Sequence, residues 1–319
     1  MSPDASWTFE PGVIALVLIV GAAYVQRWRA VRAHDGPRGA GGWRLLSFLA
    51  GLLGILVALI SPIDRLAEQI LAMHMVQHVI LLDFVPILLI LGLTKAILRP
   101  ITRRLQPIEN AAGPLGHPVV AVLLYIGAMC VWHIPALYDA AAQHASIHVL
   151  EHVAFMSAGL LYWWHLVGPL RSRLRASGMQ PVAYMLSTKF FVGLLGIVLT
   201  FAPEALYAFY KDQPDYWGLT PQADQAVAGL IMALEQSIIM GIALAWLFSR
   251  MLSESEREEQ RAELYADRER ELRVPAPALA TATATAAEPE PSTPPARAAA
   301  AAAKPSRRKK NQPTRIRRV

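Results

Sequence analysis

Histidines are concentrated at the same end of three separate apolar segments of the chain. Five of the nine histidines share this position. Four of them form two pairs with a spacing of four residues, His74 with His78 and His148 with His152, and the fifth is His133. Residues i and i+4 lie one turn apart on one face of a helix, so each pair could chelate a single metal ion. Because histidine in a membrane is costly without a partner, five rings at similar depth predict a metal site.

The side chains around these histidines favour copper. Imidazole binds copper, zinc, iron and nickel, whereas sulfur ligands favour Cu(I). Cys130 lies one turn before His133, and Met75 follows His74 directly. We therefore predict a copper site with Cys130 and Met75 as possible additional ligands, and we regard zinc or haem iron as less favoured. Either sulfur could instead be ordinary core packing, so the histidines carry the prediction.

Two acidic residues of the last apolar segment also call for an explanation. Asp224 stands at the start of this segment, where it could cap a helix, hold a histidine in one tautomer or act as an additional ligand. Glu235 falls about three turns further on, and an acid inside a membrane needs a partner or a water-filled cavity.

Three other functions are compatible with the same residues. The sequence HVLEH, residues 148–152, matches the H-x-x-E-H pattern of zinc peptidases, in which Glu151 would activate a metal-bound water. This match is short and lies at the end of an apolar segment, so we do not expect an enzyme. A b-haem electron carrier would use histidines of two helices as axial ligands. A metal-free assembly scaffold would use them as a polar network.

Seven apolar segments must position these side chains. The chain is 54% hydrophobic and only 17% charged, which is a membrane composition. Most segments reach the roughly 20 residues that a helix needs to cross a bilayer. The fold class that we predict is therefore all-α, a polytopic membrane bundle of seven transmembrane helices. The segments are residues 11–26, 43–61, 70–93, 118–136, 147–168, 182–203 and 226–248.

The distribution of basic residues gives the orientation of the bundle. Twelve Lys and Arg residues fall in the first, third and fifth gaps between segments, and two, Arg65 and Lys211, fall in the others. The positive-inside rule then places the N-terminus outside, the C-terminus in the cytoplasm and the five histidines on the outer side. The first segment is preceded by no Lys or Arg, so it is expected to be a retained helix and not a signal peptide.

The composition divides the chain into three parts. Residues 1–252 form the transmembrane domain, and Ser253 with Glu256 makes a capping box that predicts a charged cytoplasmic helix over residues 253–273. Residues 274–319 are rich in Ala and Pro, end in a polybasic run and are expected to be disordered, with anionic lipid as a possible partner.

The net positive charge of the chain does not indicate nucleic-acid binding, because membrane orientation and the basic tail account for it. The single cysteine excludes an internal disulfide, and no oligomeric state is indicated.

Five stretches of the chain resemble the integral-membrane CtaG-like cytochrome c oxidase assembly factors of caa-type oxidases. They are SPIDRLAEQILAMHMVQHVILL (61–82), VWHIPALYDAA (131–141), HVLEHVAFMSAGLLYWWHL (148–166), TFAPEALY (200–207) and ADQAVAGLIM (223–232). ALEQ at 233–236 departs from the family pattern, which has a tryptophan and small residues there.

The resemblance implies a seven-helix protein of the plasma membrane that assembles a haem-copper oxidase. It further implies copper handling and contact with oxidase subunits. The family's histidine positions fall on all five clustered histidines of this chain, and its Asp-Gln pair falls on Asp224 and Gln225.

Overall fold

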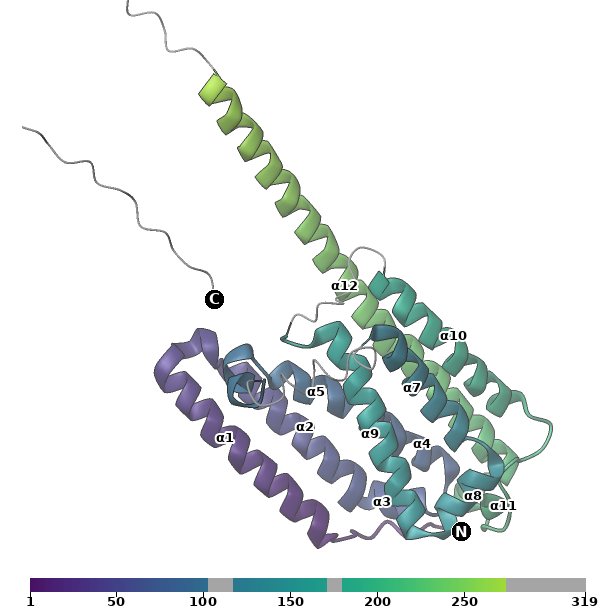
Figure 1. Cartoon of the computed structure of the whole chain (residues 1–319). Helices are drawn as coiled ribbons and strands as arrows, with labels where there is room; N and C mark the ends of the chain where they lie inside the picture. Colours follow the sequence, from purple (N-terminus) through teal and green to yellow (C-terminus); the bar gives the residue numbers. More distant parts are fainter. Residues whose placement is uncertain (103–116, 171–179, 274–319) are drawn as a thin grey trace, which may run out of the picture. The chain divides into compact units, whose positions relative to one another are not determined.

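The protein is a bundle of α-helices in the computed structural model shown in Figure 1, which describes residues 1–102, 117–170 and 180–273. Within these residues the predicted all-α class is confirmed, since no strand occurs. The predicted disordered tail, residues 274–319, and the basic residues within 103–116 and 171–179 lie outside the described residues. The chain divides into one unit from Met1 to Glu258 and a second from Glu259 to Val319.

The first half of the bundle contains two long helices and one interrupted helix. The long ones are α1 (Pro11–Gly39) and α2 (Gly42–Ile60), followed by the short α3 (Pro62–Ala67). The interrupted helix consists of α4 (Leu71–Val79), a π-helical turn η1 (Ile80–Phe84) and α5 (Val85–Gly92). Such π-helical turns within α-helices are rare and frequently occur at functional sites.

The second half begins with a bent helix pair. α7 (Pro118–Trp132) and α8 (Pro135–Gln143) meet at an angle of 75°. The predicted continuous segment 118–136 is wrong in this respect, because Pro135 lacks the N–H that would continue α7 and starts a new helix instead. The remaining elements are α9 (Ala145–Val167), α10 (Gln180–Phe201), α11 (Ala208–Lys211), η3 (Tyr216–Gly218) and α12 (Pro221–Arg273).

Five of the described helices are long and apolar enough to cross a membrane. They are α1, α2, the α4–η1–α5 helix, α10 and α12, and the bent pair α7–α8 would make a sixth. α9 has 23 residues but is not among them, because its histidines and Glu151 reduce its mean hydropathy. A membrane protein is therefore supported, while seven crossings and the orientation of the termini stay predictions.

The last helix differs from its prediction at Ser253. α12 runs without interruption from Pro221 to Arg273, so no separate helix starts at the predicted capping box. The reason is local: the Ser253 hydroxyl donates a hydrogen bond to the carbonyl of Ser249, four residues earlier, at 3.1 Å. A serine that bonds back in this way lies inside a helix and does not cap its start.

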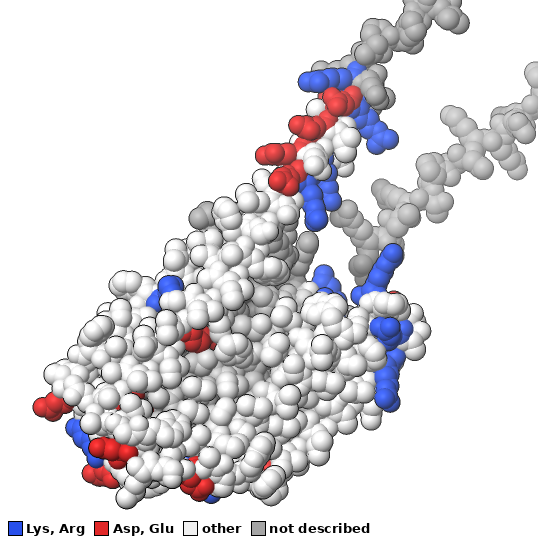
Figure 2. Space-filling model, turned by 180° about the vertical axis from the view of Figure 1, so that it is seen from behind, with Lys and Arg blue, Asp and Glu red and all other residues white. Residues whose placement is uncertain are grey.

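The surface and the core of the bundle both suit a lipid environment. Large apolar side chains point outward, among them Ile19, Phe190 and Ile242, each about two-thirds exposed. Figure 2 shows the resulting broad uncharged surface, with acidic and basic side chains mainly near the ends. The interior is built from large aromatic residues, including Tyr125, Tyr162 and Trp163.

Two features hold α9 against the interrupted helix. A Cβ atom on Gly159 would overlap the carbonyl oxygen of Leu82, so the backbones of α9 and η1 approach more closely than any residue except glycine allows. Beside this contact, buried Asp83 of η1 accepts hydrogen bonds from Tyr125 of α7 at 2.9 Å and Trp163 of α9 at 2.6 Å. Glu235 of α12 also lies close enough to Asp83 to interact with it, so the acid within the last apolar segment has the partner that the sequence required.

Candidate metal site

The two histidine pairs face each other across the contact between α4 and α9. Within each helix the ring centroids are 4.2 Å apart, both for His74 with His78 and for His148 with His152. Between the helices, His74 lies 5.4 Å from His148 and His78 lies 5.5 Å from His152. The i, i+4 spacing puts two rings on one face of each helix, and the packing of the two helices brings the four imidazoles together, which the sequence alone did not predict.

Glu151 completes this group. One ligand atom each from His74, His78, His148 and Glu151 can be chosen so that all four lie within 4.8 Å of one another. An ion with metal–nitrogen bonds of about 2.0–2.1 Å holds its ligand atoms about 3–4 Å apart, so small rotamer adjustments would close the set around one ion. Glu151 was not predicted as a ligand, although its position three residues after His148 places it on the same side of α9.

The potential ligand atoms have no hydrogen-bond partners among the described residues. This holds for Nε2 of His74, both ring nitrogens of His78, Nε2 of His148 and both carboxylate oxygens of Glu151. The closest approaches of Glu151 to His74 and His78, 3.8 and 3.7 Å, are longer than hydrogen bonds. Each buried polar group left unsatisfied costs about 1–3 kcal/mol, and an ion held between these atoms would remove that cost.

His133 lies beside this cluster and not within it. Its ring centroid is 6.0 Å from that of Tyr138 and 6.5 Å from that of Phe155. These two aromatic residues in turn contact His74 at 5.2 Å and His78 at 4.6 Å. Nδ1 of His133 lies 2.7 Å from the carbonyl oxygen of Met129, and its Nε2 is buried with no hydrogen-bond partner in the part of the chain that the structure describes. A carbonyl only accepts, so Nδ1 carries the proton and Nε2 keeps a free lone pair.

The two sulfur residues lie differently from the histidines. Cys130 is exposed on α7, whereas His133, one turn later, is 6% exposed. Met75 is buried and packs in the main hydrophobic core of the bundle. Neither position puts a sulfur atom in the group of ligand atoms formed by His74, His78, His148 and Glu151.

Asp224 positions the helix that carries His74. Its two carboxylate oxygens accept hydrogen bonds from the backbone N–H groups of Leu71 and Ala72, at 2.7 and 2.9 Å. These groups open α4, whose N-cap residue Ile70 provides no side-chain hydrogen bond. Asp224 thus caps α4 from another helix, and an acid at this end also interacts favourably with the helix dipole.

Gln225 anchors the loop that follows α10. Its side-chain oxygen accepts from the N–H of Leu206 at 2.6 Å, and its nitrogen donates to the carbonyl of Leu199 at 3.3 Å. The Asp-Gln pair therefore supports the site through the backbone of neighbouring segments.

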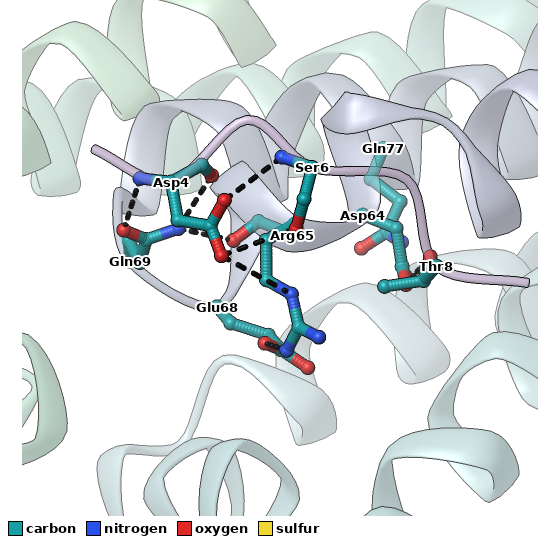
Figure 3. A network of polar contacts seen from close by, with 8 residues as sticks. All are labelled: Asp4, Ser6, Thr8, Asp64, Arg65, Glu68, Gln69 and Gln77. Atoms are coloured by element: carbon teal, nitrogen blue, oxygen red, sulfur yellow. Dashed lines mark hydrogen bonds and ion pairs between the residues drawn. The ribbon is translucent and has the colours of Figure 1, made fainter. Parts of the chain in front are cut away.

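The N-terminal segment is bound to the same end of the bundle by a polar network, shown in Figure 3. Asp64 of α3 accepts from the Thr8 hydroxyl at 2.7 Å and from the Gln77 amide, between His74 and His78, at 2.8 Å. Burial raises the pKa of Asp64 above its ordinary value, although both hydrogen bonds oppose this shift. Asp64 also lies close enough to interact electrostatically with His148. The full network comprises Asp4, Ser6, Thr8, Asp64, Arg65, Glu68, Gln69 and Gln77.

Comparison with known proteins identifies relatives. The chain is 23% identical over 282 residues to an uncharacterized protein of Mycobacterium leprae (strain TN). It is 25% identical over 284 residues to uncharacterized proteins of Mycobacterium bovis (strain ATCC BAA-935 / AF2122/97) and Mycobacterium tuberculosis (strain CDC 1551 / Oshkosh). Each match covers 82% of this chain but only 42% of the relative, so the chain spans less than half the length of these proteins. No solved structure matches the chain.

A family model gives the assignment. The model of the cytochrome c oxidase caa3 assembly factors, Caa3_CtaG, matches residues 22–254. This range contains all five predicted histidines, Glu151 and the Asp-Gln pair. The resemblance found in the sequence is thereby confirmed, and the chain belongs to the cytochrome c oxidase caa3 assembly factor family.

Proposed function

We propose that the protein holds copper as a cargo at the histidine–glutamate cluster and delivers it to a subunit of a haem-copper oxidase. In this proposal the protein crosses the plasma membrane seven times with its N-terminus outside. The cluster then faces the outer compartment. The single observation that carries the proposal is the group of buried, unpartnered ligand atoms that His74, His78, His148 and Glu151 direct at one another.

The composition of the cluster suits a metal that must be released again. Three imidazoles and a carboxylate bind copper or zinc well, and copper forms the more stable complexes. A closed cage of thiolates would retain the ion, whereas a histidine-rich site with one partly exposed ligand permits ligand exchange. His148 is the only member of the group of four that is not fully buried, so it is the first residue that an incoming or leaving ion would meet.

The geometry supports a single small ion better than haem. The rings of His74 and His148, and those of His78 and His152, are in contact across the helix interface. Axial ligation of haem requires a flat macrocycle between two such rings, and rings in mutual contact leave no room for it. A purified protein with a Soret absorption band would nevertheless support the haem alternative.

The experiment that tests the proposal is the double substitution His74→Ala with His78→Ala. It removes two of the three imidazoles of the group, so the purified protein should lose its bound copper and the host its oxidase activity. The protein should still accumulate in the membrane. The measurements are metal analysis by mass spectrometry and oxidase turnover in membranes.

A matched control removes two imidazoles outside the cluster. His34 is exposed beside Asp35, and His117 caps the start of α7, so His34→Ala with His117→Ala should leave the copper content unchanged. Equal copper content in the two double variants would refute the cluster as the copper site. Loss of oxidase activity without any copper in the wild-type protein would instead support a metal-free scaffold.

A further inference from the structure

Tyr210 lies directly behind His74, on the side away from Glu151. It belongs to the short helix α11 and is 4% exposed. Its hydroxyl donates a hydrogen bond to the carbonyl oxygen of Ala67 at 2.6 Å and lies 3.1 Å from Nδ1 of His74. The two rings meet nearly at right angles, at 89°, so the contact is made by the hydroxyl and not by ring stacking.

The proton arrangement in this chain of three groups follows from their chemistry. A carbonyl oxygen only accepts, and a tyrosine hydroxyl has one hydrogen to donate. Because the hydrogen of Tyr210 is directed at Ala67, the Tyr210 oxygen can only accept from His74. Nδ1 of His74 must therefore carry the proton in the neutral ring, and Nε2 must carry the free lone pair.

The position of Tyr210 is itself fixed by the neighbouring helix. Asp139 of α8 accepts hydrogen bonds from the N–H groups of Ala208 and Phe209, both at 3.1 Å, at the start of α11. The hydroxyl is thus a fixed acceptor for His74.

We propose that Tyr210 is a positioning residue of the metal site, which holds His74 in the tautomer that directs a bare Nε2 at the ion. This inference rests on the proposed function for the nature of the ligand. Nε2 of His74 lies 3.8 Å from Glu151 Oε2 and has no hydrogen-bond partner among the described residues, so the held tautomer points its lone pair into the cluster. Outer partners of this kind fix the ring orientation of metal-binding histidines.

The test is the variant Tyr210→Phe with Tyr207→Phe as its matched control. Tyr207 is also buried, and its hydroxyl donates to a backbone carbonyl, that of His133, at 3.3 Å. Each variant removes one buried hydroxyl, but only the first removes a hydroxyl that lies within hydrogen-bond distance of Nδ1 of His74. Nitrogen-15 solid-state NMR of the histidine rings in the metal-free protein measures the tautomer, and His74→Ala identifies the signal of His74.

We expect a protonated Nδ1 and a bare Nε2 on His74 in the wild-type protein and in Tyr207→Phe. In Tyr210→Phe the Nε2–H form should appear. A protonated Nε2 in the wild-type protein, or an unchanged tautomer in Tyr210→Phe, would overturn the inference.

Copper affinity provides the second readout. Loss of an outer partner weakens metal binding by about 10–100-fold, so Tyr210→Phe should fall in this range while Tyr207→Phe stays close to the wild type. A changed tautomer with unchanged affinity would contradict the positioning role. Absence of copper from the wild-type protein would refute the proposed function, and the NMR result on the metal-free protein would still decide what Tyr210 does to His74.

Discussion

At the residue scale, the role of Glu151 distinguishes the proposed copper site from the peptidase alternative. As a ligand, Glu151 contributes an oxygen atom and a negative charge to the group formed with His74, His78 and His148. Glu151→Gln keeps the size of the side chain but removes its charge. Loss of an outer partner weakens metal binding by about 10–100-fold, and loss of this ligand should weaken copper binding more than that. Copper titration of the purified variant measures this. A peptidase would behave differently, since the variant would retain its metal and lose proteolysis.

The sequence predicts part of this site and misses the rest for a physical reason. Four of the five predicted histidines form the facing pairs, because an i, i+4 pattern determines which side chains share a helix face. Glu151 lies on the same face as His148 but could not be distinguished from an ordinary interfacial acid without knowing that α4 packs opposite. Tyr210 is separated from His74 by 136 residues, and no local pattern connects them.

At the element scale, the close approach of α9 to η1 aligns the two halves of the cluster. Gly159→Ala would place a methyl group against the Leu82 carbonyl and force the helices apart. We expect a loss of about 1–3 kcal/mol in the free energy of unfolding, as in other overpacked contacts. Copper affinity should also fall, because α9 carries His148 and Glu151 while α4 carries His74 and His78. Thermal unfolding in detergent and copper titration check both effects.

The control for this prediction is Gly193→Ala in α10, where the added carbon would meet no described atom within 4 Å apart from its chain neighbours and its own helix backbone. That substitution should leave stability unchanged or raise it slightly, since alanine favours helices over glycine. Equal behaviour of the two alanine variants would show that the approach of α9 to η1 does not matter.

The sequence pattern predicts the positions of the helices but not all of their bounds. Hydropathy locates all seven predicted segments, and each of them contains a helix. It does not reveal the break between α7 and α8, the π-helical turn η1 or the continuation of α12 through Ser253. These features depend on single residues such as Pro135 and on tertiary contacts such as those of Asp83. A hydropathy averaged over a window of the sequence detects neither.

At the scale of the whole molecule, the proposal requires that the cluster face the outer compartment. In a Cys130→Ser background, Asp212→Cys places a thiol on the exposed loop after α11, and Glu256→Cys places one on the exposed part of α12. A membrane-impermeant maleimide applied to intact cells should label position 212 and leave position 256 unlabelled until the cells are broken. The reverse pattern would place the histidines on the cytoplasmic side and exclude delivery of copper from outside.

The most direct measurement is X-ray absorption at the copper edge of the purified wild-type protein, combined with its copper-to-protein ratio. We expect close to one copper ion per chain, coordinated by nitrogen and oxygen with the outer scattering that imidazole rings produce. A protein that takes up no copper, or a copper ion surrounded mainly by sulfur, would contradict the assignment of the site to His74, His78, His148 and Glu151.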